Sequence, residues 1–367
     1  MDFKISGYQL FAMTFIFQLG TTIIFGFGGE AGKDAWISDL VSLALGLGVV
    51  GMYTALKALN PGLTLVQWFP AQLGRWLGTP IAFLYPLMFL YIVGRIIADL
   101  RDMVSTTILP GTPLMIISGV FAFIIAYCCY GSVEIIARMS EWIFPIVVIM
   151  FLTEVLLLVG SGVLHFHHML PVLDQGWEPV GKVVFPNGIT QRFGETIALA
   201  MFWPDAKNQG RITKTTMLAT LLAGVMITCF DVLAVWVYGD LFSRFLYPLY
   251  TLLSVISVGN FIENLQMFGV LYFFATALLK SAINLLAALQ GIQQLMKMKD
   301  FRVLIIPATI VAFVLGLTMS KNIAEHIYYH HFKIVVPYFW VPLFLILPAI
   351  LLVVAWTRWI RNKVKKH

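Results

Sequence analysis

The chain has 367 residues, of which 60% are hydrophobic and only 11% charged, and its mean hydropathy is +0.88. These values exclude a soluble domain and predict an all-α polytopic membrane protein that forms one integral membrane domain over residues 1–367. The formal net charge of +6 does not indicate nucleic-acid binding, because the basic residues occupy short loops and the C-terminus rather than a soluble face.

Apolar runs long enough to cross a bilayer recur along the chain. The hydrocarbon core of a membrane requires about 20 apolar residues of helix. By this rule the sequence predicts about ten transmembrane helices. They lie near residues 8–28, 36–58, 80–106, 113–131, 142–163, 188–205, 215–238, 264–292, 302–319 and 337–359.

The basic residues that flank these spans predict the orientation of the chain. Loops rich in lysine and arginine stay in the cytoplasm, and an even number of spans returns the chain to the side on which it began. We therefore expect both termini on the cytoplasmic side. The flanking bases are Arg138, Lys207, Arg211, Lys214, Lys297, Lys299, Arg302, Arg358, Arg361, Lys363, Lys365 and Lys366.

Two segments, 63–77 and 247–261, fit neither a span nor an ordinary loop. Each lies between the second and third spans of its half, so the chain divides into two similar five-span halves, approximately 1–163 and 188–360. Because an odd number of spans reverses the topology, two such halves form an inverted repeat, as in secondary transporters. The first helix of each half is then expected to be broken near the bilayer midplane, where backbone groups face a ligand.

Both of these helices carry residues that favour a break. In the first span Gly20 precedes Thr21 and Thr22, and in the sixth span Gly194 precedes a carboxylate, Glu195. Glycine costs about 1 kcal/mol in a helix relative to alanine, and threonine hydroxyls satisfy freed carbonyls or contact a ligand. Close helix packing is the alternative explanation for the small residues. It explains the first span better than the sixth, where a carboxylate is also present.

Four segments of the sequence together indicate a protein family more specifically than the composition does. They are ISGYQLFAMTFIFQLGTT at Ile5 to Thr22, GKDAWIS at Gly32 to Ser38, FGETIALAMFWP at Phe193 to Pro204 and NFIENLQ at Asn260 to Gln266. The chain thereby resembles, over nearly its whole length, the B subunit of spore nutrient germinant receptors. That family is a branch of the amino acid–polyamine–organocation transporter superfamily. In the last segment the family commonly has an acid, a base and a further acid, whereas this chain has Glu263, Asn264 and Gln266.

The resemblance implies a LeuT-like 5+5 inverted-repeat fold with broken first and sixth helices, in the inner membrane of a dormant bacterial endospore. It implies a subunit that senses a germinant such as an amino acid together with an A subunit and a lipoprotein C subunit. In this fold the third and eighth spans border the ligand site. Exposed amides at a helix break favour a carboxylate, and exposed carbonyls with an acid favour an ammonium, so such a site suits a small zwitterion.

Six charged residues lie well inside the predicted spans, away from their ends, where a charge costs at least about 2.5 kcal/mol and usually lines a cavity or has a partner. On the third span, Tyr91, Arg95 and Asp99 are spaced by four residues and share one helix face. The two charges either form an ion pair that only stabilises this helix, or the face approaches the broken helices. The six are Arg95, Asp99, Glu154, Glu195, Asp231 and Lys280.

Lys280 lies deep in the eighth span, one turn after Thr276. A lysine at this depth needs an acid, and Glu154 or Asp231 is the expected partner. The alternative is that its side chain snorkels to the membrane interface.

These observations predict a binding protein rather than an enzyme, without a cofactor, a catalytic residue or a metal. The run from His165 to His168 lacks an Asp or Cys at ligand spacing. The favoured function is a germinant-sensing receptor subunit. A stand-alone amino-acid transporter, coupled to protons through Glu195 or Glu154, is the alternative, and the buried charges argue against a ligand-free scaffold. The predicted ligand-binding residues are Gly20, Thr21, Thr22, Tyr91, Arg95, Phe193, Gly194, Glu195, Thr196, Thr276 and Lys280.

Overall fold

The computed structural model describes residues 3–26, 28–258, 262–263, 265–320 and 325–364. This part of the chain is almost entirely helical, and its only sheet is a pair of two-residue antiparallel strands, β1 (Ser257–Val258) and β2 (Ile262–Glu263). The segment from Asn260 to Gln266, which contributes to the family resemblance, lies largely outside the described residues.

Seven helices in the described part are long and apolar enough to cross a membrane, which makes the chain an integral membrane protein. Each coincides with a predicted span. An eighth predicted span, 113–131, is the shorter apolar helix α6 (Leu114–Tyr130). The seven are Gly29–Leu59, Arg75–Thr107, Ser132–Gly160, Gln209–Arg244, Gln266–Met296, Phe301–Thr318 and Lys333–Val364.

The other two predicted spans, 8–28 and 188–205, are built from short pieces. The first consists of α1 (Gly7–Leu19) and α2 (Thr22–Phe25), and the sixth includes α9 (Ile189–Arg192) and the 3₁₀ segment η4 (Gly194–Met201). The interruptions therefore fall where Gly20 and Gly194 predicted them. The full count of ten spans and the relation between the two halves remain predictions.

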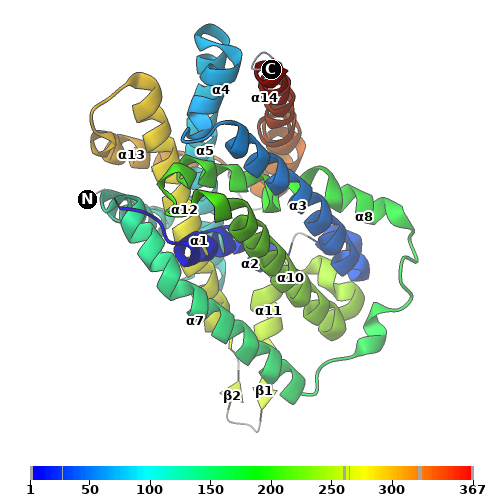
Figure 1. Cartoon of the computed structure of the whole chain (residues 1–367). Coiled ribbons are helices and arrows are strands. Elements are labelled where there is room, and N and C mark those ends of the chain that lie inside the picture. The colour runs from blue at the N-terminus through cyan, green and yellow to red at the C-terminus, as the bar shows by residue number, and fades with distance from the viewer. Residues whose placement is uncertain (1–2, 27, 259–261, 264, 321–324, 365–367) are drawn as a thin grey trace.

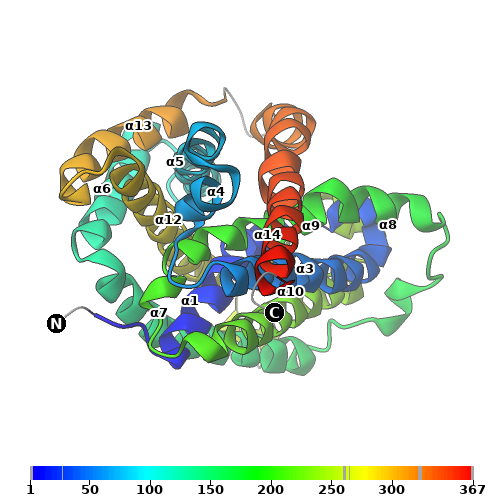
Figure 2. The ribbon, with the colours of Figure 1, turned by 45° about the horizontal axis from the view of Figure 1, so that its top comes forward.

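The long helices form a bundle around the first span (Figure 1). Helix α1 packs against α7, α10 and α12, while α12 lies along α5 and α10 lies along α3. Figure 2 shows α14 beside α3, and α13 with α6 on the outside of α5. These helices are α3 (Ala35–Leu59), α5 (Arg75–Thr107), α7 (Ser132–Gly160), α10 (Ile212–Tyr238), α12 (Gln266–Met296), α13 (Ile305–Thr318) and α14 (Leu347–Val364).

Shorter elements connect the long helices. The two segments that fitted neither span nor loop contain short helices, α4 (Leu65–Leu73) and α11 (Pro248–Ser254). The connection before the sixth span holds η2 (Phe166–Met169), α8 (Trp177–Val183) and η3 (Val184–Gly188). The remaining elements are η1 (Gly29–Asp34), η5 (Trp203–Asp205), η6 (Gln209–Arg211), η7 (Gly239–Arg244), η8 (Phe301–Leu304) and η9 (Glu325–Ile346).

The outer surface of the bundle is apolar where a bilayer would contact it. On α7, for example, the large apolar side chains of Trp142, Leu152 and Leu156 are exposed, because no described element covers them. Large exposed hydrophobic side chains in such numbers mark a surface that faces lipid.

Close packing of α5 on α13 depends on two glycines. A Cβ atom at Gly94 would lie 2.8 Å from Cβ of Leu315 and 3.1 Å from the carbonyl oxygen of Ala312, and one at Gly316 would lie 2.7 Å from Cγ2 of Ile97. The two helices therefore approach closely only because these positions have no side chain.

The substitution Gly94→Leu is expected to lower the free energy of unfolding by about 1–3 kcal/mol, because overpacking forces the two helices apart. Thermal unfolding of the detergent-purified protein measures the effect. Gly48→Leu is the matched control, since a Cβ atom at Gly48 would meet nothing within 4 Å. Equal stability of the two variants would contradict the described contact between α5 and α13.

Candidate functional site

The first helix break is at Gly20, which ends α1 with φ +37° and ψ −124°. A side chain is strained at this positive φ. A Cβ atom at Gly20 would also collide with Cδ of Lys280 on α12. The carbonyl oxygen freed by the break accepts a hydrogen bond of 2.7 Å from Oγ1 of Thr276. The break is thus tied directly to the eighth predicted span.

Two threonines continue the chain beyond this break. Thr21 and Thr22 are buried, and within the described part of the chain their hydroxyl groups have no hydrogen-bond partner. A buried hydroxyl without a partner is costly, and native structures contain few of them. In the described structure the two hydroxyls are therefore unsatisfied polar groups beside the break.

The second break is at Phe193, between α9 and η4. The ring of Phe193 lies against Gly46 of α3, where any Cβ atom would overlap it. The next carbonyl, that of Gly194, accepts a hydrogen bond of 3.1 Å from the hydroxyl of Tyr53, which also lies 2.6 Å from the carbonyl oxygen of Phe344. The hydroxyl of Tyr53 therefore connects this second break to α3 and η9 through hydrogen bonds.

A glutamine joins the two broken helices. Nε2 of Gln18, on α1, donates to Oγ1 of Thr196 at 3.0 Å and to Oγ1 of Thr220 at 2.8 Å. All three side chains are buried. Movement of η4 relative to α1 consequently breaks at least one buried polar contact.

A cluster of four charges lies between the breaks and the flanking helices. Glu195 is completely buried, with its Oε2 2.5 Å from Nζ of Lys280 and its Oε1 3.8 Å from Nη2 of Arg95. Nη1 of Arg95 is in turn 3.8 Å from Oδ2 of Asp99. The cluster holds two positive and two negative side chains and has no net charge, the arrangement that makes buried ions tolerable.

The expected partner of Lys280 was wrong. Neither Glu154 nor Asp231 pairs with it in the described structure, and the side chain does not snorkel, because it is buried and bound to Glu195. Glu154 is instead buried against Tyr272, and Asp231 lies beside Asp39. The helix rotations that decide these pairings cannot be read from the spacing of charges along one helix.

The predicted site residues are only partly brought together. Tyr91 is half-buried among apolar side chains on α5, one turn from Arg95, and Phe193 faces α3 rather than the charge cluster. Sequence reasoning also missed contributors, among them Tyr53, Gln18 and Trp340, whose ring centroid lies 5.3 Å from Cζ of Arg95. A glutamine inside an apolar run was a usable signal, whereas the aromatic residues had none.

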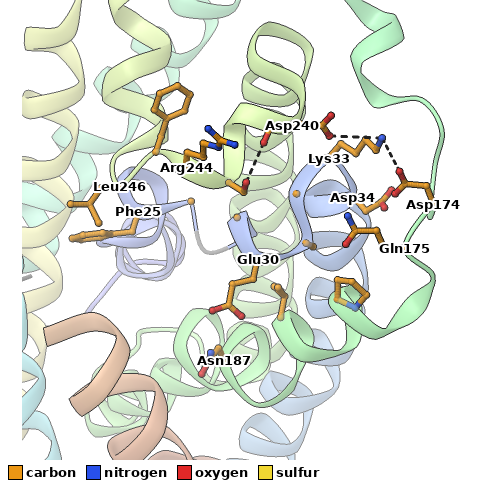
Figure 3. Close-up of a pocket in the computed structure, with 18 residues that line it drawn as sticks. Phe25, Glu30, Lys33, Asp34, Asp174, Gln175, Asn187, Asp240, Arg244 and Leu246 are labelled. Atoms are coloured by element: carbon orange, nitrogen blue, oxygen red, sulfur yellow. Dashed lines mark hydrogen bonds and ion pairs between the residues drawn. The ribbon is translucent and has the colours of Figure 1, made fainter. Parts of the chain in front are cut away.

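A polar cavity of about 650 Å³ opens near the site without reaching it (Figure 3). Lys33 lies in its wall, with Nζ 3.1 Å from a carboxylate oxygen of Asp174 and 3.8 Å from one of Asp240. None of the eleven predicted ligand residues lines this outer vestibule. It is lined by Phe25, Gly26, Gly29, Glu30, Ala31, Gly32, Lys33, Asp34, Asp174, Gln175, Pro179, Val183, Asn187, Asp240, Ser243, Arg244, Phe245 and Leu246.

Aromatic side chains pack together where α2 meets the vestibule. Phe25, at the end of α2, lines the vestibule, and its ring centroid is 5.5 Å from that of Tyr247 and 6.1 Å from that of Phe273. At the opposite ends of the two broken spans, main-chain hydrogen bonds join the residues just before the first span to those just after the sixth. The amide of Ile5 donates to the carbonyl of Asp205 at 2.9 Å, and the amide of Lys207 donates to the carbonyl of Ile5 at 2.8 Å.

Loss of the hydroxyl in Thr276→Val is expected to lower the free energy of unfolding by about 1–3 kcal/mol, because the buried carbonyl of Gly20 then has no donor. Thr276→Ser keeps the donor and is the matched control. If thermal unfolding gave the valine and serine variants the same stability, the hydrogen bond would not hold the first break.

The fold and the site together define a class: an integral membrane protein of the transporter fold, with two interrupted spans and buried charges beside them. The structure is similar to that of Mhp1, a nucleobase-cation-symport-1 family transporter solved in a closed conformation with bromovinylhydantoin bound. The TM-score is 0.68 at 13% identity, over 88% of this chain and 73% of that one. This likeness concerns the fold alone.

The family follows from the sequence. The family model described as spore germination protein matches residues 4–324, and the chain belongs to that family. Spore germination protein KB of Bacillus subtilis (strain 168) is 29% identical over 99% of this chain and 97% of its own length. Spore germination protein YndE of the same organism is 27% identical over 72% of this chain and 73% of its own.

Proposed function

We propose that the chain is the germinant-sensing membrane subunit of a spore germination receptor, and that it binds a small amino acid between its two helix breaks. In this proposal it spans the inner membrane of the endospore ten times, as two inverted five-span halves, with both termini on the spore core side. It passes ligand binding on to the A and C subunits of the receptor. Family membership and the transporter fold support this assignment.

The observation that carries the proposal is the burial of Glu195 at the second break between the cations of Arg95 and Lys280. A charge cluster with no net charge suits a zwitterion, because the ligand adds none. Arg95 and the free hydroxyls of Thr21 and Thr22 would take the ligand carboxylate. Glu195 and the carbonyls at the breaks would take its ammonium group.

Signalling requires two states with different affinities for the ligand. The aromatic contacts of Phe25 close the vestibule side, and the pairing of Ile5 with Asp205 and Lys207 closes the other end. A ligand that binds both breaks favours the state in which α2 and α9 lie closest to the rest of the bundle. In the proposal this movement of the vestibule wall is what partner subunits detect.

A proton-coupled amino-acid transporter is the second candidate. The likeness to a symporter fold favours it, as does the buried carboxylate of Glu154 beside Tyr272 on α12. Proton coupling in membrane transporters commonly uses buried carboxylates.

Uptake by vesicles discriminates the two candidates. The purified chain is reconstituted alone, and uptake of radiolabelled amino acids is measured with and without an imposed proton gradient. A receptor subunit is expected to give no uptake above that of empty vesicles, while still binding to co-expressed A and C subunits in a pull-down assay. Gradient-driven uptake by the chain alone, lost in Glu154→Gln, would favour the transporter.

A further inference from the structure

A second group of buried charges lies on the other side of the sixth-span break. It consists of Asp39 on α3, Arg192 on α9 and Asp231 on α10, and all three side chains are almost completely buried. Arg192 forms an ion pair with Asp39 through Nη1 and Oδ1. The carboxyl group of Asp231 lies beside that of Asp39, and within the described chain Oδ2 of each has no hydrogen-bond partner.

This group is not balanced in charge. The carboxyl groups of Asp39 and Asp231 lie beside a single guanidinium group, that of Arg192. Two carboxylates in one site cannot both stay ionised without compensation, and a proton on one of them lets it donate a hydrogen bond to the other. By contrast, the cluster around Glu195 has equal numbers of both signs.

Other titratable groups near α10 have partners of their own. His168, on η2, lies with its Nδ1 3.0 Å from the carbonyl oxygen of Trp236. Asp240, on η7, pairs with Lys33, and Asp34 accepts a hydrogen bond from the amide of Leu173. None of these residues therefore supplies a second positive charge to balance the carboxylates of Asp39 and Asp231.

We propose that Asp39 and Asp231 form a proton-binding site, in which the two carboxyl groups share one proton and Arg192 balances the remaining charge. Arg192 also has hydrogen-bond donors that could stabilise the site after the proton has left. Within the described chain, Nε and Nη2 of Arg192 have no hydrogen-bond partner although the side chain is buried. When the proton leaves, these donors receive the second carboxylate.

The proton exchanges with water in the outer vestibule. A Cβ atom at Gly28 would lie 2.9 Å from Oδ2 of Asp231, so the main chain of Gly28 passes close to this carboxyl group. The neighbouring Gly26 and Gly29 line the vestibule, whose wall also carries charged side chains (Figure 3). Asp231 thus lies directly behind the vestibule wall.

Proton release also acts on the sixth-span break. Arg192 is the last residue of α9, and Glu195 follows three residues later on η4. A guanidinium group that turns to a second carboxylate on α10 pulls α9 toward that helix. This effect on ligand binding rests on the proposed function, whereas the proton site itself does not.

Infrared spectroscopy tests the site on the purified full-length protein in lipid nanodiscs. At neutral pH the wild type is expected to show the carbonyl absorption of a protonated carboxyl group, shifted in heavy water. This absorption decreases in Asp231→Asn, in which the amide donates to Asp39 without a titrating proton. The exposed Asp240→Asn is the matched control and leaves the absorption unchanged. Equal absorption in wild type and Asp231→Asn would overturn the proposal.

Thermal unfolding gives a second readout, which begins with the wild type alone. Folding takes up about one proton at neutral pH if the pair is protonated, because free aspartate is ionised there. The melting temperature of the wild type therefore falls as the pH rises toward the point where the folded pair loses its proton, and it levels off above that point. Asp39→Asn, in which the shared proton is absent, is expected to show a weaker fall. A melting temperature raised by added Na⁺ or K⁺ in the wild type but not in Asp39→Asn would instead assign the site to a metal cation.

Discussion

Lys280→Met is expected to lower the free energy of unfolding by about 3–5 kcal/mol, the cost of removing one member of a buried ion pair. Glu195 then keeps only the longer contact with Arg95 and remains completely buried. The cluster also changes from no net charge to one negative charge. Thermal unfolding in detergent and the amount of protein in the membrane measure the loss.

The matched variant removes both charges. In the double substitution Lys280→Met with Glu195→Leu, the pair Arg95 and Asp99 stays balanced. Replacement of a buried ion pair by apolar side chains of similar volume is often neutral or stabilising, so the double variant is expected to recover most of the lost stability. If Lys280→Met alone were as stable as the wild type, the contact of Lys280 with Glu195 would not hold α12 to the sixth-span break.

The second large effect concerns ligand response. The double substitution Glu195→Gln with Lys280→Gln keeps two polar side chains of similar size and leaves the cluster neutral. It removes the charged partner for a ligand ammonium group, which is worth about 1.5–3 kcal/mol. The nutrient concentration that triggers germination is therefore expected to rise by about 10- to 100-fold.

Spores that carry the variant at normal protein levels provide this measurement. Glu178→Gln is the control, because Glu178 is an exposed residue on α8 that pairs only with Lys182 in the described structure. The control is expected to respond like the wild type. An unchanged nutrient sensitivity in the double variant would remove Glu195 from the ligand site.

Hydropathy and small residues were sufficient to predict the arrangement along the chain. Predicted spans coincide with the long helices because burial in lipid requires length and apolar character, both of which are visible in sequence. The two breaks were predicted for a similar reason: Gly20 adopts a positive φ that only glycine accepts easily. Residues near both breaks, such as Glu195, were therefore identified correctly as polar and buried.

Pairings between helices were not predictable from the same patterns. The partner of Lys280 depends on how α12 is rotated against η4, which no spacing within one helix determines. Asp39 and Arg192 were missed because each lies near the start of a predicted span, where a charge is ordinarily explained by the membrane interface. Only the fold places them together with Asp231, behind the vestibule.

The most direct test of the account is nutrient-triggered germination of spores that lack this gene and any redundant receptors. Wild type, Glu195→Gln or Glu178→Gln is returned to these spores, and the amounts of all three receptor subunits are measured in the same preparations. At a nutrient concentration that just triggers the wild type, the account predicts a response with the wild type and with Glu178→Gln, and none with Glu195→Gln at equal protein level. A normal response in the deletion strain, or with Glu195→Gln, would contradict a sensor whose ligand site is at the sixth-span break.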